Sequence, residues 1–332
     1  MTTFIIYNNI KIVYVQLLHN CAINNILYIK YLIMARIKIS ELIEDAKQKK
    51  YAIGYFESWD IESTLAIAKA AEKMNSPVIL GFSGIYLPNP LRIYKSSLKL
   101  YADIVNSIAT EIKVPAATIF NESPFYESVI ENINYGYDLV MFTDENLEYD
   151  ELIKKIKKLV KSAHEKGVKV EGEVNTLIGA GNYILDIPED VKITEPKIAK
   201  KFVEDTNIDF LAVNLGQAHM HGRKKMHLDI RKLDEIKKLI DIPLVLHGMS
   251  SIAEEDIKEA IKHGITKINV SSKMRQIYFK TIKEECKKIG QNYNPYIIIG
   301  SGFKEDIITK ANINVQKFVE KTIDILGCSG KA

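Results

Sequence analysis

Eight short apolar runs, each separated from the next by an amphipathic segment, constrain the fold of this chain more than any other feature. The runs occupy residues 51–56, 76–81, 114–120, 137–143, 168–174, 209–215, 242–247 and 266–270. Segments between them, such as 61–75, 145–167 and 254–264, carry apolar residues at spacings of three and four, which predicts helices. Near-continuous apolar strands that alternate with helices predict a parallel sheet covered on both faces. Eight such units in roughly 240 residues are typical of a (β/α)8 TIM barrel. A doubly wound sheet is the alternative, but no glycine-rich dinucleotide fingerprint follows the first run.

Composition limits the classes of partner. The 332 residues are 47% hydrophobic and 26% charged, and the formal net charge is +3. So small a net charge gives no argument for binding to nucleic acid or to a membrane, and we expect neither. The three cysteines, Cys21, Cys286 and Cys328, are far apart, which indicates a reducing compartment without a disulfide framework. We therefore expect a cytoplasmic protein.

Residues 1–33 differ from the rest of the chain. They are rich in Ile, Asn, Tyr and Leu without clean helical or alternating periodicity. No stretch reaches the roughly 18 uninterrupted apolar residues of a membrane-spanning helix, and no small-residue cleavage site follows a compact apolar core. We interpret residues 1–33 as a non-native or disordered extension, with a membrane anchor as the alternative. Residues 34–332 then form the barrel.

Polar residues follow or close the predicted strands. In chain order they are Glu57, Asp60, Ser83, Asn121, Glu122, Thr143, Asp144, Glu171, Glu173, His219, His221, His247, Asn269 and Ser272. Because the sites of (β/α)8 barrels lie at the carboxyl ends of the strands, these side chains are expected to converge on one polar site.

Four of these residues, Glu122, Glu173, His219 and His247, suggest a metal centre. Two imidazoles with one or two carboxylates suit zinc, and also cobalt, manganese or iron. Such a metal could act as a Lewis acid on a carbonyl group. The basic run 222–225 could hold a phosphate together with the turns after the last two strands, although such a run is also common in a solvated loop.

The chain from about Met34 to its end resembles the class II, metal-dependent ketose-bisphosphate aldolases. The resemblance lies in the order and spacing of several motifs: YAIGYF with IESTLAIAKAAEKMNSPVIL, VKVEGEV, ITEPKIAKKFVEDTNIDFLAVNLGQAH, IPLVLHGMSS, GITKINVSS and the closing CSGKA. It implies a (β/α)8 fold, a divalent metal, most consistently Zn²⁺, and retro-aldol cleavage through a metal-stabilised enediolate of a three-carbon ketose phosphate. It also implies a homodimer or homotetramer with a role in carbohydrate metabolism related to glycolysis.

The resemblance assigns roles residue by residue. His247 matches the metal-ligand histidine of the family's Leu-His-Gly-Gly-Ser-Gly motif, and His219 matches the ligand in Gly-Thr-Ala-His-Gly, with His221 competing for that role. Glu173 matches a carboxylate near the metal, and we place it with Asn121 among the catalytic positions. The substrate and phosphate contacts predicted are Ser83, Gly222, Lys224, Gly248, Met249, Ser250, Asn269, Val270, Ser271 and Ser272.

Two departures affect the chemistry directly. Asn121 stands where the family has an aspartate that transfers a proton, and an amide cannot do so at pH 7. Glu122 stands where a third metal-binding histidine is expected; His2Glu is a known catalytic ligand set, so the metal could be retained. The loop 179–190 has no acid directly after its glycines, and the family's Asn-rich turn after strand 1 has become Glu57-Ser-Trp-Asp60. The acids that could take over proton transfer are Glu57, Asp60, Asp186 and Glu189.

Three functions are consistent with the sequence. The first is a metal-dependent aldolase acting on a phosphorylated ketose. The second is an epimerase or isomerase that uses the same enediolate, and the third is a non-catalytic, aldolase-like protein that binds sugar phosphates. The apolar periodicity of residues 311–326 predicts a final helix that packs either against a partner subunit or back onto its own barrel.

Overall fold

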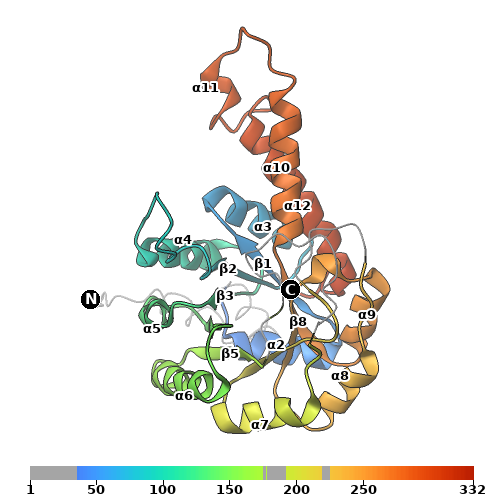
Figure 1. Ribbon diagram of the computed structural model, residues 1–332. Coiled ribbons are helices and arrows are strands. Elements are labelled where there is room, and N and C mark those ends of the chain that lie inside the picture. Colours follow the sequence, from blue (N-terminus) through green and yellow to red (C-terminus); the bar gives the residue numbers. More distant parts are fainter. Residues whose placement is uncertain (1–35, 175–176, 178–191, 219–224) are drawn as a thin grey trace, which may run out of the picture. The chain divides into compact units, whose positions relative to one another are not determined.

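The chain forms a closed barrel of eight parallel strands in the order β1 to β8 (Figure 1). The computed structural model describes residues 36–174, 177, 192–218 and 225–332. The strands are β1 (Ile53–Ser58), β2 (Val78–Ser83), β3 (Ala116–Ser123), β4 (Leu139–Phe142), β5 (Lys169–Glu173), β6 (Phe210–Val213), β7 (Leu244–Leu246) and β8 (Ile265–Val270). Each strand pairs with the next, and β8 pairs with β1, so the predicted (β/α)8 architecture is confirmed.

Helices alternate with the strands and surround the barrel (Figure 1). They are α2 (Ile39–Lys49), α3 (Ile61–Lys73), α4 (Leu98–Glu111), α5 (Tyr126–Ile133), α6 (Tyr149–Glu165), α7 (Pro196–Thr206), α8 (Ile230–Lys237), α9 (Glu254–Lys262), α10 (Ser272–Cys286), α11 (Pro295–Ile298) and α12 (Ile307–Leu326). Their apolar faces join the strand side chains in one buried core. In the described part of the chain, no helix is long and apolar enough to cross a membrane.

The first three strands extend further than the apolar runs predicted. Glu57, Ser83, Asn121 and Glu122 were expected beyond the strand ends, but each lies within a strand. The reason is pairing between neighbouring strands: Glu57 is in register with Gly81, and Ser83 is in register with Asn121, so the backbone ladder continues through the polar residues. Polar side chains at these positions are the inner lining of the barrel's carboxyl end.

The last helix packs back onto its own barrel. Four apolar residues of α12, Val315, Val319, Ile323 and Leu326, are fully buried, and the helix packs chiefly against α3 and α10. Of the two arrangements that its periodicity allowed, this is the one observed. Large exposed apolar side chains lie in the arm that α10, α11 and the start of α12 extend away from the barrel, and in the loop between β2 and α4 (Figure 1).

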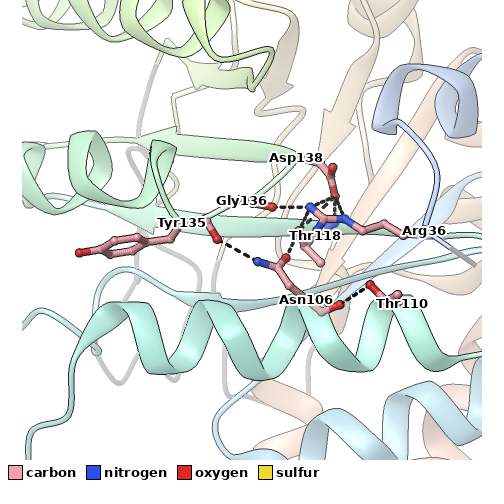
Figure 2. A network of polar contacts seen from close by, with 7 residues as sticks. All are labelled: Arg36, Asn106, Thr110, Thr118, Tyr135, Gly136 and Asp138. Carbon is pink, nitrogen blue, oxygen red and sulfur yellow. Dashed lines mark hydrogen bonds and ion pairs between the residues drawn. The ribbon is translucent and has the colours of Figure 1, made fainter. Parts of the chain in front are cut away.

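A polar network fixes the start of the described chain to the amino end of the barrel (Figure 2). Arg36 forms an ion pair with Asp138 at 3.1 Å, and Asp138 Oδ2 also accepts from the Thr118 backbone N–H at 2.8 Å. The Thr118 hydroxyl lies 3.0 Å from Asn106 of α4. Burial raises the pKa of Asp138 despite the opposing effects of Arg36 and Thr118. The network therefore connects α4, β3 and β4 to Arg36, which lies shortly before α2.

Candidate active site

A pocket lies at the carboxyl ends of the strands, where the sequence placed the site. It is lined by Tyr55, Glu57, Asn121, Glu122, Gly248, Met249, Ser250, Asn269, Val270, Ser271 and Ser272. Nine of the residues predicted as catalytic, metal-binding or substrate-binding are therefore brought together here. The enclosed volume is about 20 Å³, room for about one water molecule. A sugar phosphate requires the surrounding side chains to separate.

His247, directly after β7, is the centre of the buried polar groups. Its Nδ1 lies 2.6 Å from Glu122 Oε1, and its Nε2 lies 2.8 Å from Glu171 Oε1. Burial by itself lowers the pKa of His247, but the two carboxylates outweigh burial and raise it to about 10. In this arrangement the ring is an imidazolium that donates to Glu171 through Nε2 and forms an ion pair with Glu122 through Nδ1.

The charge on Glu171 is balanced by a second cation. Lys267 of β8 is fully buried, and its Nζ lies 2.8 Å from Glu171 Oε2. Burial raises the pKa of Glu171, but Lys267 and His247 together bring it below its usual value. From Glu122 through His247 and Glu171 to Lys267, the charges alternate in sign, so the row is neutral as a whole.

Lys267 also orients the amide of Asn269. The Lys267 ammonium donates to Asn269 Oδ1 at 2.6 Å, and Asn269 Nδ2 in turn donates to Asn121 Oδ1 at 3.4 Å. The ammonium lies 5.4 Å from the centre of the Tyr55 ring as well. Since Lys267 can only donate, it fixes which end of the Asn269 side chain faces Asn121.

The backbone at Glu122 is unusual. Its φ is +48°, a left-handed conformation that few residues other than glycine adopt, and the register of β3 against β4 shifts between Phe120 and Ser123. A bulge of this kind redirects a side chain at the end of a strand. Here it places the carboxylate beside His247.

The turn after β7 has the backbone geometry that an anion site requires. Gly248 has a φ of +70°, and an added Cβ would lie 2.9 Å from Leu177 Cδ2 and 3.2 Å from the Ala218 carbonyl oxygen, so glycine is needed. A short 3-10 helix, Met249–Ser251, follows at once. Lys225 Nζ donates to the Ser250 carbonyl at 2.8 Å, which brings a positive charge to this turn.

The first turn of α10 is the other side of the same anion site. The helix begins at Ser272, directly after β8, and its first backbone N–H groups have no intrahelical partner. Helix N-termini attract anions, and the loops after strands 7 and 8 are a common phosphate site in (β/α)8 barrels.

Glu173 closes β5 beside the pocket without lining it. It is buried, and its Oε1 accepts from Thr143 Oγ1 at 2.6 Å. Burial, reinforced by the nearby Glu122 and Glu171, raises the pKa of Glu173 to about 7 despite the opposing influence of His247. A carboxyl group with this pKa can both donate and accept a proton near neutral pH.

Several predicted residues are not part of the described pocket. His219, His221, Gly222 and Lys224 lie outside the described residues, as do Asp186 and Glu189. Ser83, on β2, is in register with Asn121 of β3 but does not line the pocket. Within the described residues, no group of three or more His, Cys, Asp or Glu side chains is arranged to hold a metal ion.

The two candidate ligands that are described nevertheless fit a divalent metal. Glu122 Oε1 and His247 Nδ1 face each other, and the other ring nitrogen of His247 is held by a buried carboxylate. Metal-binding histidines usually have this second partner, because it fixes the ring and its tautomer.

Sequence reasoning missed two cations of the site, Lys267 and Arg275. Arg275, in the first turns of α10, forms an ion pair with Glu57 at 2.9 Å. Its guanidinium lies over the rings of Trp59 and Tyr86, 5.1 Å and 5.3 Å from their centres. A usable signal was the pair of buried acids Glu57 and Glu171, since buried carboxylates require cationic or hydrogen-bonding partners.

The fold and the pocket define a (β/α)8 barrel with a buried histidine-carboxylate centre beside an anion-binding turn. Residues 37–331 match the family model described as "Fructose-bisphosphate aldolase class-II". The chain therefore belongs to the class II fructose-bisphosphate aldolase family.

Curated relatives and solved structures agree with this assignment. A fructose-bisphosphate aldolase of Streptococcus pneumoniae is 32% identical over 90% of this chain and 100% of its own length. A probable fructose-bisphosphate aldolase of Bacillus subtilis is 33% identical over 83% of this chain and 96% of its own. The crystal structure of the YdjI aldolase of Escherichia coli K12 matches with a TM-score of 0.71 and 27% identity, covering 89% of this chain and 98% of that one.

Proposed function

We propose that this chain is a metal-dependent aldolase that cleaves or forms a carbon–carbon bond in a phosphorylated ketose. Support comes from one observation above all: a buried histidine-carboxylate pair lies beside a pocket whose lining includes the turn after β7 and the start of α10. Glu122 lines this pocket and contacts His247, while Gly248, Ser250 and the first turn of α10 form its phosphate side. Family membership and the relatives' names support the same reaction class.

Glu122, His247 and His219 would hold the metal, most consistently Zn²⁺. When bound, such an ion polarises the carbonyl of the ketose. The protein's part is to hold these ligands in place: Glu171 fixes the His247 ring, and Lys267 fixes Glu171. Of the two alternatives for the third ligand, His219 remains our proposal over His221 on the basis of its distance from β6.

Other residues in the pocket and beside it would bind the substrate and transfer protons. Backbone N–H groups at Gly248 and at the start of α10 are suited to a phosphate. The Asn269 amide, oriented by Lys267, is placed to contact a hydroxyl or carbonyl oxygen of the ketose. Glu173, with a pKa of about 7, is a proton donor and acceptor at the edge of the pocket. Retro-aldol cleavage would leave an enediolate of the three-carbon product.

The test is a cleavage assay on the purified full chain loaded with zinc, cobalt or manganese. The substrates are fructose 1,6-bisphosphate and a panel of ketose 1-phosphates and ketose bisphosphates. We expect release of a three-carbon ketose phosphate, together with about one divalent ion per chain by plasma mass spectrometry. His247→Ala should lose both the ion and the activity.

The matched control is His263→Ala, which removes a half-buried histidine that contacts Asp234 and Glu259 on the outer helices. It should keep both the ion and the activity. A parent chain that cleaves no member of the panel in any metal-loaded form would overturn the proposal.

Asn121 favours a second candidate, an aldolase-like protein that binds sugar phosphates without cleaving them, because an amide has replaced the proton-transferring carboxylate at this position. The same panel separates the two functions. Saturable binding of a ketose phosphate by isothermal titration calorimetry, with no cleavage, is the result expected for the binding protein.

A further inference from the structure

The pocket lacks a proton-transferring group at the position where the family has one. Asn121 lines the pocket, and its Oδ1 accepts from Asn269. Since an amide neither gains nor loses a proton near pH 7, cleavage requires another group to take the proton of the hydroxyl that becomes the aldehyde.

Asp186 and Glu189 lie outside the described residues, but the structure distinguishes among the described acids that could replace it. Asp60 is used as the N-cap of α3, where its Oδ1 accepts from the Ser63 backbone N–H at 2.7 Å. Glu122 is engaged by His247, and Glu173 is held by Thr143 outside the pocket. Glu57 lines the same pocket as Asn121.

Glu57 is placed on the correct strand for this role. Side chains from alternate strands of a (β/α)8 barrel share a layer of its interior, so the ends of β1 and β3 present Glu57 and Asn121 to one space. Glu57 is 5% exposed, and its immediate partners hold it firmly in position.

Both partners of Glu57 contact the same oxygen. Ser271 Oγ donates to Glu57 Oε1 at 2.8 Å, and Arg275 Nη2 donates to the same atom at 2.9 Å. Among the described residues these contacts orient the carboxylate through one oxygen and leave Oε2 available to a substrate.

We propose that Glu57 is the catalytic residue that takes over hydroxyl proton transfer from the position of Asn121. The inference rests on the proposed aldolase function. In the cleavage direction, the C3–C4 bond of the ketose breaks and its electron pair stays on C3, giving the enediolate of the three-carbon ketose phosphate. The C4 hydroxyl becomes the aldehyde carbonyl, and its proton passes to Glu57 Oε2. In the synthesis direction, the same proton returns to the new C4 oxygen.

The test distinguishes transfer of the C4 hydroxyl proton from transfer of the proton on C3. Glu57→Gln is assayed in two reactions: cleavage of the substrate found active in the panel, and exchange of C3 hydrogen for deuterium in dihydroxyacetone phosphate, followed by NMR. Cleavage needs the hydroxyl proton acceptor, whereas exchange does not involve a C4 hydroxyl. We expect kcat for cleavage to fall by a factor on the order of 10²–10⁴, with the exchange rate kept within about threefold.

Three further variants complete the experiment. Glu62→Gln, the same substitution at an exposed position of α3, should leave both reactions unchanged. Glu57→Asp should keep part of the cleavage activity. Glu57→Gln combined with Asn121→Asp should recover cleavage, because it returns the carboxylate to the other side of the same pocket.

The outcomes are distinct. Equal losses of cleavage and exchange in Glu57→Gln, without recovery in the double variant, would mean that Glu57 only supports the pocket, and would overturn the inference. Cleavage by Glu57→Gln at a rate within threefold of the parent's would also overturn the inference. A parent chain that exchanges deuterium but cleaves nothing, or does neither, would overturn the aldolase function and this inference with it.

Discussion

At the scale of single residues, the most consequential feature is the neutral row of buried charges that ends at Lys267. Both Lys267 and Glu171 are fully buried, and their 2.8 Å contact is the last link before His247. A buried ion pair contributes little by itself, but removal of one partner leaves an uncompensated charge in the interior. The lysine is therefore needed for stability even though it lies behind the predicted ligands.

Lys267→Met should destabilise the protein by about 3–5 kcal/mol, because Glu171 loses its cation at nearly constant side-chain volume. Urea unfolding followed by circular dichroism measures the change. The control is Lys258→Met on α9, which removes an exposed pair with Glu254 and should cost less than about 1 kcal/mol. Equal effects of the two substitutions would contradict the assigned role of Lys267.

The sequence was sufficient to find His247 and Asn269 but not Lys267. His247 ends one apolar run and Asn269 is the last residue but one of another, so the barrel rule places both at the carboxyl face. Lys267 lies inside an alternating run, where a charged residue ordinarily faces water. Only the closed barrel shows that this position faces the interior and Glu171. The contacts of Glu122 were likewise unpredictable, because they depend on a bulge and a positive φ.

At the scale of elements, the apolar pattern located every strand but misplaced several ends. The predicted run 51–56 became Ile53–Ser58, because pairing with β2 continues past its apolar residues, through Glu57 and Ser58. The final helix was predicted at 311–326 and begins earlier, at Ile307. Its start is set by hydrogen bonds to Asp306, and hydrophobic periodicity does not detect such bonds.

Asp306→Ala should destabilise α12 by about 1–2 kcal/mol at pH 7. Burial raises the pKa of Asp306, but its hydrogen bonds from the backbone N–H groups of Gly302, Ile308 and Thr309 outweigh burial and lower it. A lowered pKa means that this stabilisation is present above the unfolded-state value near 3.9 and is lost as pH falls through the folded-state value.

The difference in unfolding free energy between the parent and Asp306→Ala should therefore shrink from pH 7 to pH 3.5, as measured by urea unfolding. Asp103→Ala on α4 is the control, since its pair with Lys99 is more than half exposed. A difference that stays constant with pH would show that the carboxylate charge is not what caps the helix.

At the scale of the whole molecule, the count of eight strand-helix units identified the barrel, but periodicity could not show what each helix packs against. The structure buries α12 on its own barrel and leaves apolar side chains exposed on the arm formed by α10, α11 and α12 (Figure 1). Tyr296 is 87% exposed and Phe303 is 62% exposed. Exposed apolar groups gathered on one segment favour a contact with another protein.

We expect the arm to form the contact in the homo-oligomer that the family resemblance implies. Tyr296→Lys combined with Phe303→Lys should reduce the oligomer to a monomer in size-exclusion chromatography with light scattering. Ile198→Lys, at a single exposed apolar residue of α7, should leave the mass unchanged. A double variant with the parent's mass would exclude the arm as the interface.

Trp59 is an intrinsic fluorescence reporter of the pocket. It is the single tryptophan of the sequence, and the guanidinium of Arg275 lies 5.1 Å from the centre of its ring. The same guanidinium is bound to Glu57 in the pocket. Tryptophan emission therefore comes from one place, two contacts away from where a ligand would bind, and its intensity can follow occupancy of the pocket without a dye or a coupled enzyme.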